Sequence, residues 1–120
     1  MPAENLKADS VSVVIPVYNE ADSLPLLHQS LHQALDDLSM PWEIVYVDDG
    51  SRDHSLEVLI SLAQADPEHT SVVQLRRNFG QTAAIAAGID HACGEIIVLM
   101  DADLQNDPAD IPMMLEKIGE

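Results

Sequence analysis

IIVLMDADLQNDP, residues Ile96–Pro108, is the stretch that decides the expected fold. Its first five residues, Ile96 to Met100, form a continuous apolar run, which is typical of a strand buried on both faces in the middle of a parallel sheet. Asp101 and Asp103 follow at once, and unpaired carboxylates are too costly to bury. Open α/β sheets bind ligands at the carboxyl ends of their strands. We therefore expect these two acids to hold a divalent cation at that edge.

Strand-like and helix-like segments alternate along the whole chain. β-Branched and apolar runs predict strands at Val11–Pro16, Trp42–Val47, Ser71–Leu75 and Glu95–Met100. Four helices are predicted between and after these strands. The first has Asn19 as its N-cap and carries leucines as far as Leu38, and the second, His54–Ala65, is capped by Asp53. The third, Thr82–Ala92, consists mainly of small residues and should pack tightly, and the fourth is Pro108–Ile118. Each crossover is long enough for right-handed parallel pairing, so the pattern predicts an α/β fold, a three-layer αβα sandwich with a mainly parallel sheet.

Composition limits the class of partner. In 120 residues, 21 acidic side chains against five basic ones give a formal net charge of −16, which disfavours nucleic acid and anionic lipid as partners. The single cysteine, Cys93, excludes an internal disulfide, and its small neighbours suggest that it is packed. Residues 1–10 are polar and expected to be flexible, with no signal peptide. No run reaches the ~18–20 apolar residues of a membrane span, so we expect a cytoplasmic chain.

Polar loops follow three of the predicted strands: Tyr18-Asn19-Glu20, Asp48-Asp49-Gly50-Ser51 and Asp101-Ala102-Asp103. In a parallel sheet these loops share one edge and can form one cleft. The chain has neither a G-x-G-x-x-G motif nor a P-loop, so a phosphate bound there needs a cation. Two carboxylates suit Mg²⁺ or Mn²⁺, which would bridge two phosphates of a nucleotide and stabilise a leaving diphosphate.

Some of these residues also have simpler explanations. Glu20 suits the first turn of a helix, the pair Asp48-Asp49 suits a turn, and Asp103 suits a turn or a cap. His28 and His32 lie four residues apart, but the glutamate of H-E-x-x-H is missing and no third ligand is evident. We predict that these two histidines lie on a solvated helix face.

Three segments together resemble the family 2 glycosyltransferases of the GT-A fold: VSVVIPVYNEADSL, EIVYVDDGSRDHS and RRNFGQTAAIAAGIDHACGEIIVLMDADLQNDP. The resemblance runs from about Val11 to Ile118. Within the family, RNFGQ and DADLQNDP resemble the polyprenyl-phosphate sugar transferases, the dolichol-phosphate mannose synthase-like branch. This resemblance implies an inverting transferase that moves a sugar from a nucleotide-diphosphate donor to a polyprenyl phosphate at the cytoplasmic face of a membrane.

The resemblance also implies a set of site residues. The base and ribose site would be lined by Pro16, Tyr18, Asn19 and Glu20, with Asp48 bound to the base edge and Asp49 beside the ribose and diphosphate. The backbone would pass close to the nucleotide at Gly80 and Gln81. The metal and diphosphate would be bound by the segment Asp101, Ala102 and Asp103, with Gln105 nearby. Asp101 and Asp103 would be the metal ligands. A glycine at position 80 suits a close backbone approach because no Cβ blocks it.

Family members continue beyond the helix that follows D-x-D into an acceptor-binding part, and many of this branch add membrane helices. We therefore expect residues 11–120 to be the nucleotide-sugar-binding part, with no assignable general base and little activity alone. An uncovered edge strand or apolar patch would favour self-association. Three alternatives stay open: a non-catalytic nucleotide-binding module, a transferase that acts on a saccharide acceptor, and a phosphotransfer domain.

Overall fold

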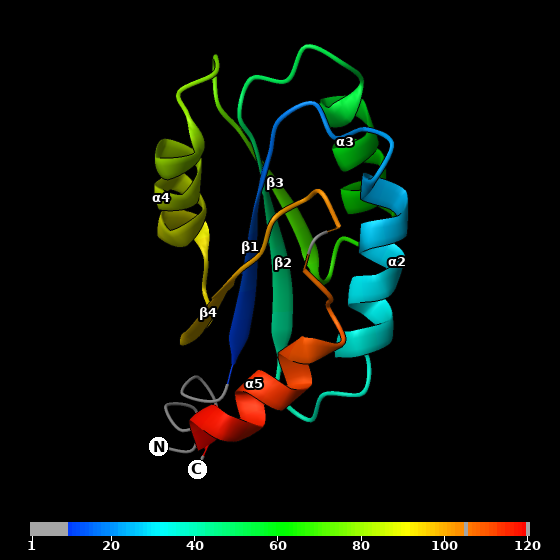
Figure 1. The fold of residues 1–120 in the computed structure, drawn as a ribbon, viewed down its shortest axis with the longest axis vertical. Coiled ribbons are helices and arrows are strands. Elements are labelled where there is room, and N and C mark those ends of the chain that lie inside the picture. Colours follow the sequence, from blue (N-terminus) through cyan, green and yellow to red (C-terminus); the bar gives the residue numbers. More distant parts are fainter. Residues whose placement is uncertain (1–9, 105, 120) are drawn as a thin grey trace.

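The computed structural model describes residues 10–104 and 106–119, so the N-terminal segment 1–9, Gln105 and Glu120 lie outside the described part (Figure 1). The elements are β1 (Val11–Val17), α2 (Leu24–Leu35), β2 (Trp42–Asp48), α3 (Ser55–Ala65), β3 (Thr70–Gln74), α4 (Gln81–His91), β4 (Ile96–Leu99) and α5 (Asp110–Gly119). The strands pair in the order β3-β2-β1-β4, and all three pairings are parallel.

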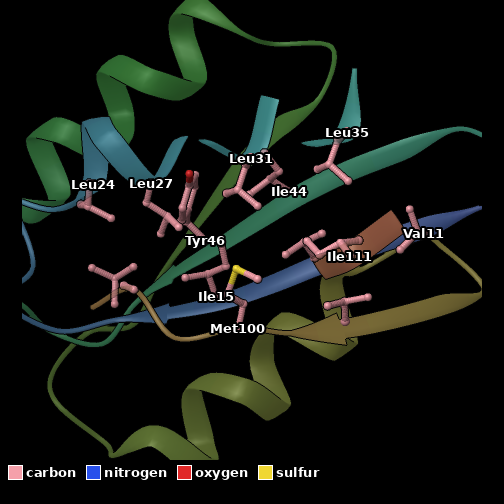
Figure 2. Close-up of a cluster of buried hydrophobic side chains, with 14 of the residues drawn as sticks. Val11, Ile15, Leu24, Leu27, Leu31, Leu35, Ile44, Tyr46, Met100 and Ile111 are labelled. Carbon is pink, nitrogen blue, oxygen red and sulfur yellow. The ribbon is translucent and has the colours of Figure 1, made fainter. Parts of the chain in front are cut away.

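Helices cover both faces of the sheet, with α2, α3 and α5 on one face and α4 on the other (Figure 1). Alternation along β1 divides its side chains between the two faces, because successive residues of a strand point in opposite directions. Val13 and Ile15 pack with the leucines of α2 in the larger core, as Figure 2 shows for Ile15, whereas Val14 packs with Ala84 beneath α4. The predicted three-layer αβα sandwich is therefore confirmed.

Helix α4 lies very close to the sheet, as its small residues predict. A Cβ atom added at Gly88 would come within 2.4 Å of the Val14 Cγ1 atom and 3.0 Å of the Val47 Cγ2 atom. The absence of a side chain at Gly88 thus sets the distance between the helix and the two central strands.

The position of β4 differs from the prediction. In the described part of the chain, β4 is an edge strand that pairs only with β1, and Leu99 is 51% exposed. The prediction of a strand buried on both faces was wrong because an apolar run does not show how many neighbours a strand has. Cys93, expected to be packed, is exposed; the tight position is Gly94, where a Cβ would lie 2.7 Å from the Ser12 Oγ atom.

The start of α2 also differs from the prediction. The helix begins at Leu24 with Ser23 at the N-cap position, so Asn19 lies outside it. Asn19 has a φ of 55° and its side chain serves a neighbouring loop instead. Asp53, by contrast, does serve the start of α3, because its carboxylate accepts the Ser55 N–H at 2.9 Å.

His28 and His32 do not form a solvated face. His28 is 8% exposed and its Nδ1 lies 2.7 Å from the hydroxyl of Tyr46, while His32 lies between Asp36 and Asp66. Partial burial disfavours the charged imidazole of His32, yet hydrogen bonds to Asp66 and Asp36 raise its pKa. The prediction failed because Tyr46 and Asp66 come from other elements. None of the described helices combines the length and apolar character needed to cross a bilayer.

Candidate functional site

A cleft of about 390 Å³ opens where β1, β2 and β4 end, beside the start of α4. Nine of the predicted site residues line it: Pro16, Tyr18, Glu20, Asp49, Gly80, Gln81, Asp101, Ala102 and Asp103. Val17 and Asn78 line it too and were not predicted. Asn19 and Asp48 are not among the lining residues, and Gln105 lies outside the described residues. The structure thus brings the predicted polar loops together at one edge of the sheet.

The loops that follow β1 and β2 are held to each other by hydrogen bonds to Asn19. Its Oδ1 accepts the backbone N–H of Arg52 at 2.8 Å, and its own N–H donates to the Ser51 Oγ at 3.0 Å. One residue later, the Glu20 N–H donates to the Ser55 Oγ at 2.8 Å. Asn19 therefore joins the loops after β1 and β2, although it does not line the cavity itself.

Asp49 holds the loop before α4 in place. One carboxylate oxygen accepts the Phe79 N–H at 2.8 Å, and the other accepts the Gly80 N–H at 3.1 Å and lies 3.2 Å from the Asn78 side-chain nitrogen. The Asn78 amide also donates to the Asp49 carbonyl oxygen at 3.0 Å. The chain passes closely at Gly50, where an added Cβ would come within 2.4 Å of the Asn78 nitrogen. In the segment RNFGQ only Gly80 and Gln81 were predicted as site residues, so the role of Asn78 was missed.

Asp48 is the last residue of β2, next to Asp49, and only 2% of its surface is exposed. Its Oδ2 accepts the Ser51 N–H at 3.3 Å, but its Oδ1 is buried and has no hydrogen-bond partner in the described structure. Buried polar atoms are usually paired, so an unpaired carboxylate oxygen beside a cleft calls for a donor from a ligand or from water.

The D-x-D loop is tied to two other elements. The Gln81 side-chain amide donates to the Asp101 Oδ1 at 3.3 Å, and the Ser23 hydroxyl donates to the Ala102 carbonyl at 2.8 Å. Asp103 is exposed at the cleft, and the next residue, Leu104, has a φ of 66° that turns the chain sharply. Asp101 and Asp103 therefore face the same cavity from a loop fixed at both α2 and α4.

The chemistry of the cleft fits a hard divalent cation. All four charged residues that line it are acids: Glu20, Asp49, Asp101 and Asp103. Such a cleft repels a diphosphate unless a cation lies between them. Among the described residues, Asp101 and Asp103 do not belong to a close group of three acidic, histidine or cysteine ligands, so substrate oxygens or water would have to complete the coordination of a cation held there. Mg²⁺ is typically held in this way, by one or two carboxylates and substrate phosphates.

The sequence matches known proteins over almost its whole length. The model of glycosyl transferase family 2 matches residues 12–120. The undecaprenyl-phosphate 4-deoxy-4-formamido-L-arabinose transferase of Salmonella choleraesuis (strain SC-B67) is 48% identical over 110 residues, which cover 92% of this chain and 34% of that protein. The transferase of the same name from Sodalis glossinidius (strain morsitans) is 49% identical over 111 residues. The chain thus spans 34% of the length of these curated relatives.

Solved structures share the fold. The mannosyltransferase PcManGT from Pyrobaculum calidifontis, in complex with GDP-Man and Mn²⁺, is 32% identical with a TM-score of 0.63, and the match covers 78% of this chain and 27% of that one. S. aureus TarS in complex with UDP-GlcNAc is 25% identical with a TM-score of 0.73, covering 92% of this chain and 31% of that one. These matches confirm the predicted GT-A type of α/β fold.

Proposed function

Because the chain belongs to glycosyl transferase family 2, we propose that its cleft binds the nucleotide diphosphate of a nucleotide-sugar donor through a divalent cation. The observation that carries the proposal is the convergence of Asp101 and Asp103 with the β1 and β2 loops on one acid-lined cavity. A diphosphate has the charge that such a cavity, once it holds a cation, would attract.

In this proposal Asp101 and Asp103 hold Mg²⁺ or Mn²⁺, and Mn²⁺ is present in the PcManGT complex. When bound, the cation supplies positive charge that stabilises the departing diphosphate. Gly80 presents backbone without a side chain to the donor, in a loop that Asp49 fixes. Asp48 does not line the cleft and its Oδ1 is buried, so the contact of Asp48 with the base edge stays a prediction.

The proposed acceptor for the whole protein is a polyprenyl phosphate, because the two relatives above are undecaprenyl-phosphate sugar transferases. An oxygen of the acceptor phosphate attacks the anomeric carbon as the bond from that carbon to the diphosphate breaks, and the electron pair leaves on the diphosphate. Direct displacement inverts the configuration. The attacking oxygen is already anionic, so this reaction does not require a general base, and we propose that it takes place at the cytoplasmic face of a membrane.

The test is calorimetric titration of the purified chain with UDP and with GDP, each with and without Mn²⁺. Supporting results are metal-dependent binding of one nucleotide and a loss of affinity of about tenfold or more, about 1.4 kcal/mol, in Asp103→Asn. Asp37→Asn is the matched control, since it removes the same charge from an exposed residue outside the cleft. No nucleotide binding by a folded chain, or equal affinity with and without the metal, would contradict the proposal.

A further inference from the structure

A second group of metal-ligating side chains lies away from the cleft. His28 and His32 on α2 and Asp66 at the end of α3 place one ligand atom each within 4.8 Å of one another. Among the described residues this is the one group of three or more such ligands. Asp66 lies four residues before Thr70, which starts β3, so the group is near the amino edge of the sheet, whereas the cleft is at the carboxyl edge.

His32 faces a carboxylate with each ring nitrogen. Its Nδ1 lies 2.9 Å from the Asp36 Oδ1, and its Nε2 lies 2.6 Å from the Asp66 Oδ2. Ionised carboxylates only accept hydrogen bonds, and a neutral imidazole carries one N–H. If Nδ1–H donates to Asp36, the lone pair on Nε2 therefore faces an oxygen lone pair of Asp66. This arrangement is favourable only with a cation between them, either a proton or a metal ion.

His28 supplies a second nitrogen to the same oxygen. Its Nε2 lies 3.5 Å from the Asp66 Oδ2, while its Nδ1 lies 2.7 Å from the hydroxyl of Tyr46. A tyrosine hydroxyl can accept the Nδ1–H, which leaves the Nε2 lone pair available. Figure 2 shows the Tyr46 side chain extending from β2 towards α2. Metal-binding histidines typically have this arrangement, with the second nitrogen held by an outer partner.

The contacts of Asp66 with the two histidines can be compared with the geometry of a small tetrahedral ion. Bonds of ~2.0–2.1 Å to such an ion separate its ligand atoms by roughly 3.3 Å, close to the separation of His28 Nε2 and Asp66 Oδ2. The shorter contact of His32 with Asp66 would lengthen by roughly 0.7 Å to reach this value, which a small movement of the more exposed His32 side chain can supply.

The surroundings hold Asp66 in place and partly exclude water. The Thr70 hydroxyl donates to the Asp66 Oδ2 at 2.7 Å, and the Asp66 side chain is only 17% exposed. The ring of His69 stacks on that of Trp42, with 3.8 Å between the ring centroids, and the His69 Nδ1 lies 3.5 Å from the Asp66 Oδ1. The fourth coordination position would be left to water.

We propose that His28, His32 and Asp66 form a site for a divalent transition-metal ion of the zinc type, separate from the cleft. Two imidazoles and one carboxylate suit Zn²⁺ or Co²⁺, whereas Mg²⁺ prefers oxygen ligands alone. An ion bound there joins α2 to the turn between α3 and β3, so it stabilises the folded chain over the unfolded one.

The test is titration with Zn²⁺ by calorimetry and with Co²⁺ by visible absorption, both in excess Mg²⁺ to occupy the cleft. All measurements use a Cys93→Ser background, because Cys93 is an exposed thiol that would also bind these metals. His28→Gln and His32→Gln each remove one ligand, and we expect each to weaken Zn²⁺ binding by more than about 100-fold, beyond the 10- to 100-fold typical of an outer partner. Asp36→Asn, a change to such a partner, should weaken binding by about tenfold.

His54→Gln is the matched control. His54 is also a histidine beside a carboxylate, with its Nδ1 2.9 Å from the Glu57 Oε2, but it is exposed and belongs to no group of three ligands in the part of the chain that the structure describes. We expect the Zn²⁺ affinity of His54→Gln to equal that of the parent. The absorption bands of four- or five-coordinate Co²⁺ should appear in the parent and in His54→Gln, and they should be missing in His32→Gln. Far-UV circular dichroism checks folding; His32 is the more exposed of the two ligands, so His32→Gln should fold even if His28→Gln does not. Equal Zn²⁺ affinity in the parent and a folded His32→Gln, or no saturable binding by the parent, would overturn the proposal.

Discussion

The Asp49 carboxylate accepts the Gly80 N–H at 3.1 Å, a contact that joins the end of β2 to a residue 31 positions further along the chain. Because Phe79 donates to the other carboxylate oxygen, both oxygens of Asp49 fix the loop that leads into α4. One wall of the cleft therefore depends on a side chain that also lines it.

Asp49→Asn should destabilise this loop. The asparagine keeps one oxygen but turns an NH₂ group towards a backbone N–H, so one partly buried donor loses its acceptor. We expect the free energy of unfolding to fall by about 1–3 kcal/mol. Hydrogen exchange at the Phe79 and Gly80 amides should quicken, as measured by NMR or mass spectrometry. Asp37→Asn is the control, and unchanged exchange in Asp49→Asn would show that the loop does not need the carboxylate.

Two glycines with positive φ should respond differently to alanine. Gly80 has a φ of 103° and open space around it, so Gly80→Ala should cost about 1–3 kcal/mol of folding free energy through backbone strain alone. Gly50 has a φ of 72° and lies against the backbone of Arg77 and Asn78, so Gly50→Ala adds a steric cost of about 1–3 kcal/mol to the strain. Chemical denaturation of both variants measures the difference, and an equal loss would contradict the close approach at Gly50.

Asp53 should give stability that depends on pH. Hydrogen bonds from Ser55 hold the pKa of Asp53 below its ordinary value of 3.8. Its ionised form therefore stabilises the folded state fully above about pH 4, and this contribution is lost as the pH falls through the folded pKa. We expect Asp53→Asn to be less stable than the parent at pH 6, with a difference that shrinks towards pH 3 in urea unfolding. A difference that stays constant, or that Asp37→Asn reproduces, would argue against this role.

The edge position of β4 bears on the prediction of self-association. In the described part of the chain, one side of β4 has no neighbouring strand, and Leu99 is 51% exposed there. Such edges favour pairing with a second copy, and a lysine on the edge opposes it. We expect concentration-dependent sedimentation in the parent and about tenfold weaker association, about 1.4 kcal/mol, in Leu99→Lys. Leu26→Lys, at a leucine on α2 that is 55% exposed, is the control; a monomeric parent would show that the prediction is wrong.

Local pattern predicted the elements of the fold well. The alternation of Val13, Val14 and Ile15 marks a strand covered on both sides, and the small residues of α4 predict close packing that Gly88 confirms. The order of the strands could not be predicted from the sequence. An apolar run such as Ile96–Leu99 does not show whether its strand has neighbours on both sides, and β4 has only β1 as a neighbour among the described strands.

The site residues also divide into those that the local sequence predicts and those whose roles depend on contacts with distant residues. Asp101 and Asp103 could be placed at the cleft because the end of a parallel strand fixes where the next residues lie. The role of Asn19 could not be predicted, since its partner, the Arg52 N–H, lies 33 residues away. The prediction that His28 and His32 lie on a solvated face failed for a related reason. Their helical spacing could be read from the sequence, but Asp66 contacts them only because α3 packs on α2.

The central place of β1 has a consequence during protein synthesis. On one side β1 pairs with β2, the next strand in the sequence, and on the other side it pairs with β4, the last strand. The distance along the chain is large: the Gly94 N–H that donates to the Ser12 Oγ lies 82 residues after Ser12. A chain emerging from the ribosome thus carries an open strand in the middle of its unfinished sheet until β4 has been made. Pairings between distant segments form slowly and expose the nascent chain to aggregation. The yield of soluble protein in cells should therefore be set by chaperone supply and translation rate as much as by the stability of the finished fold.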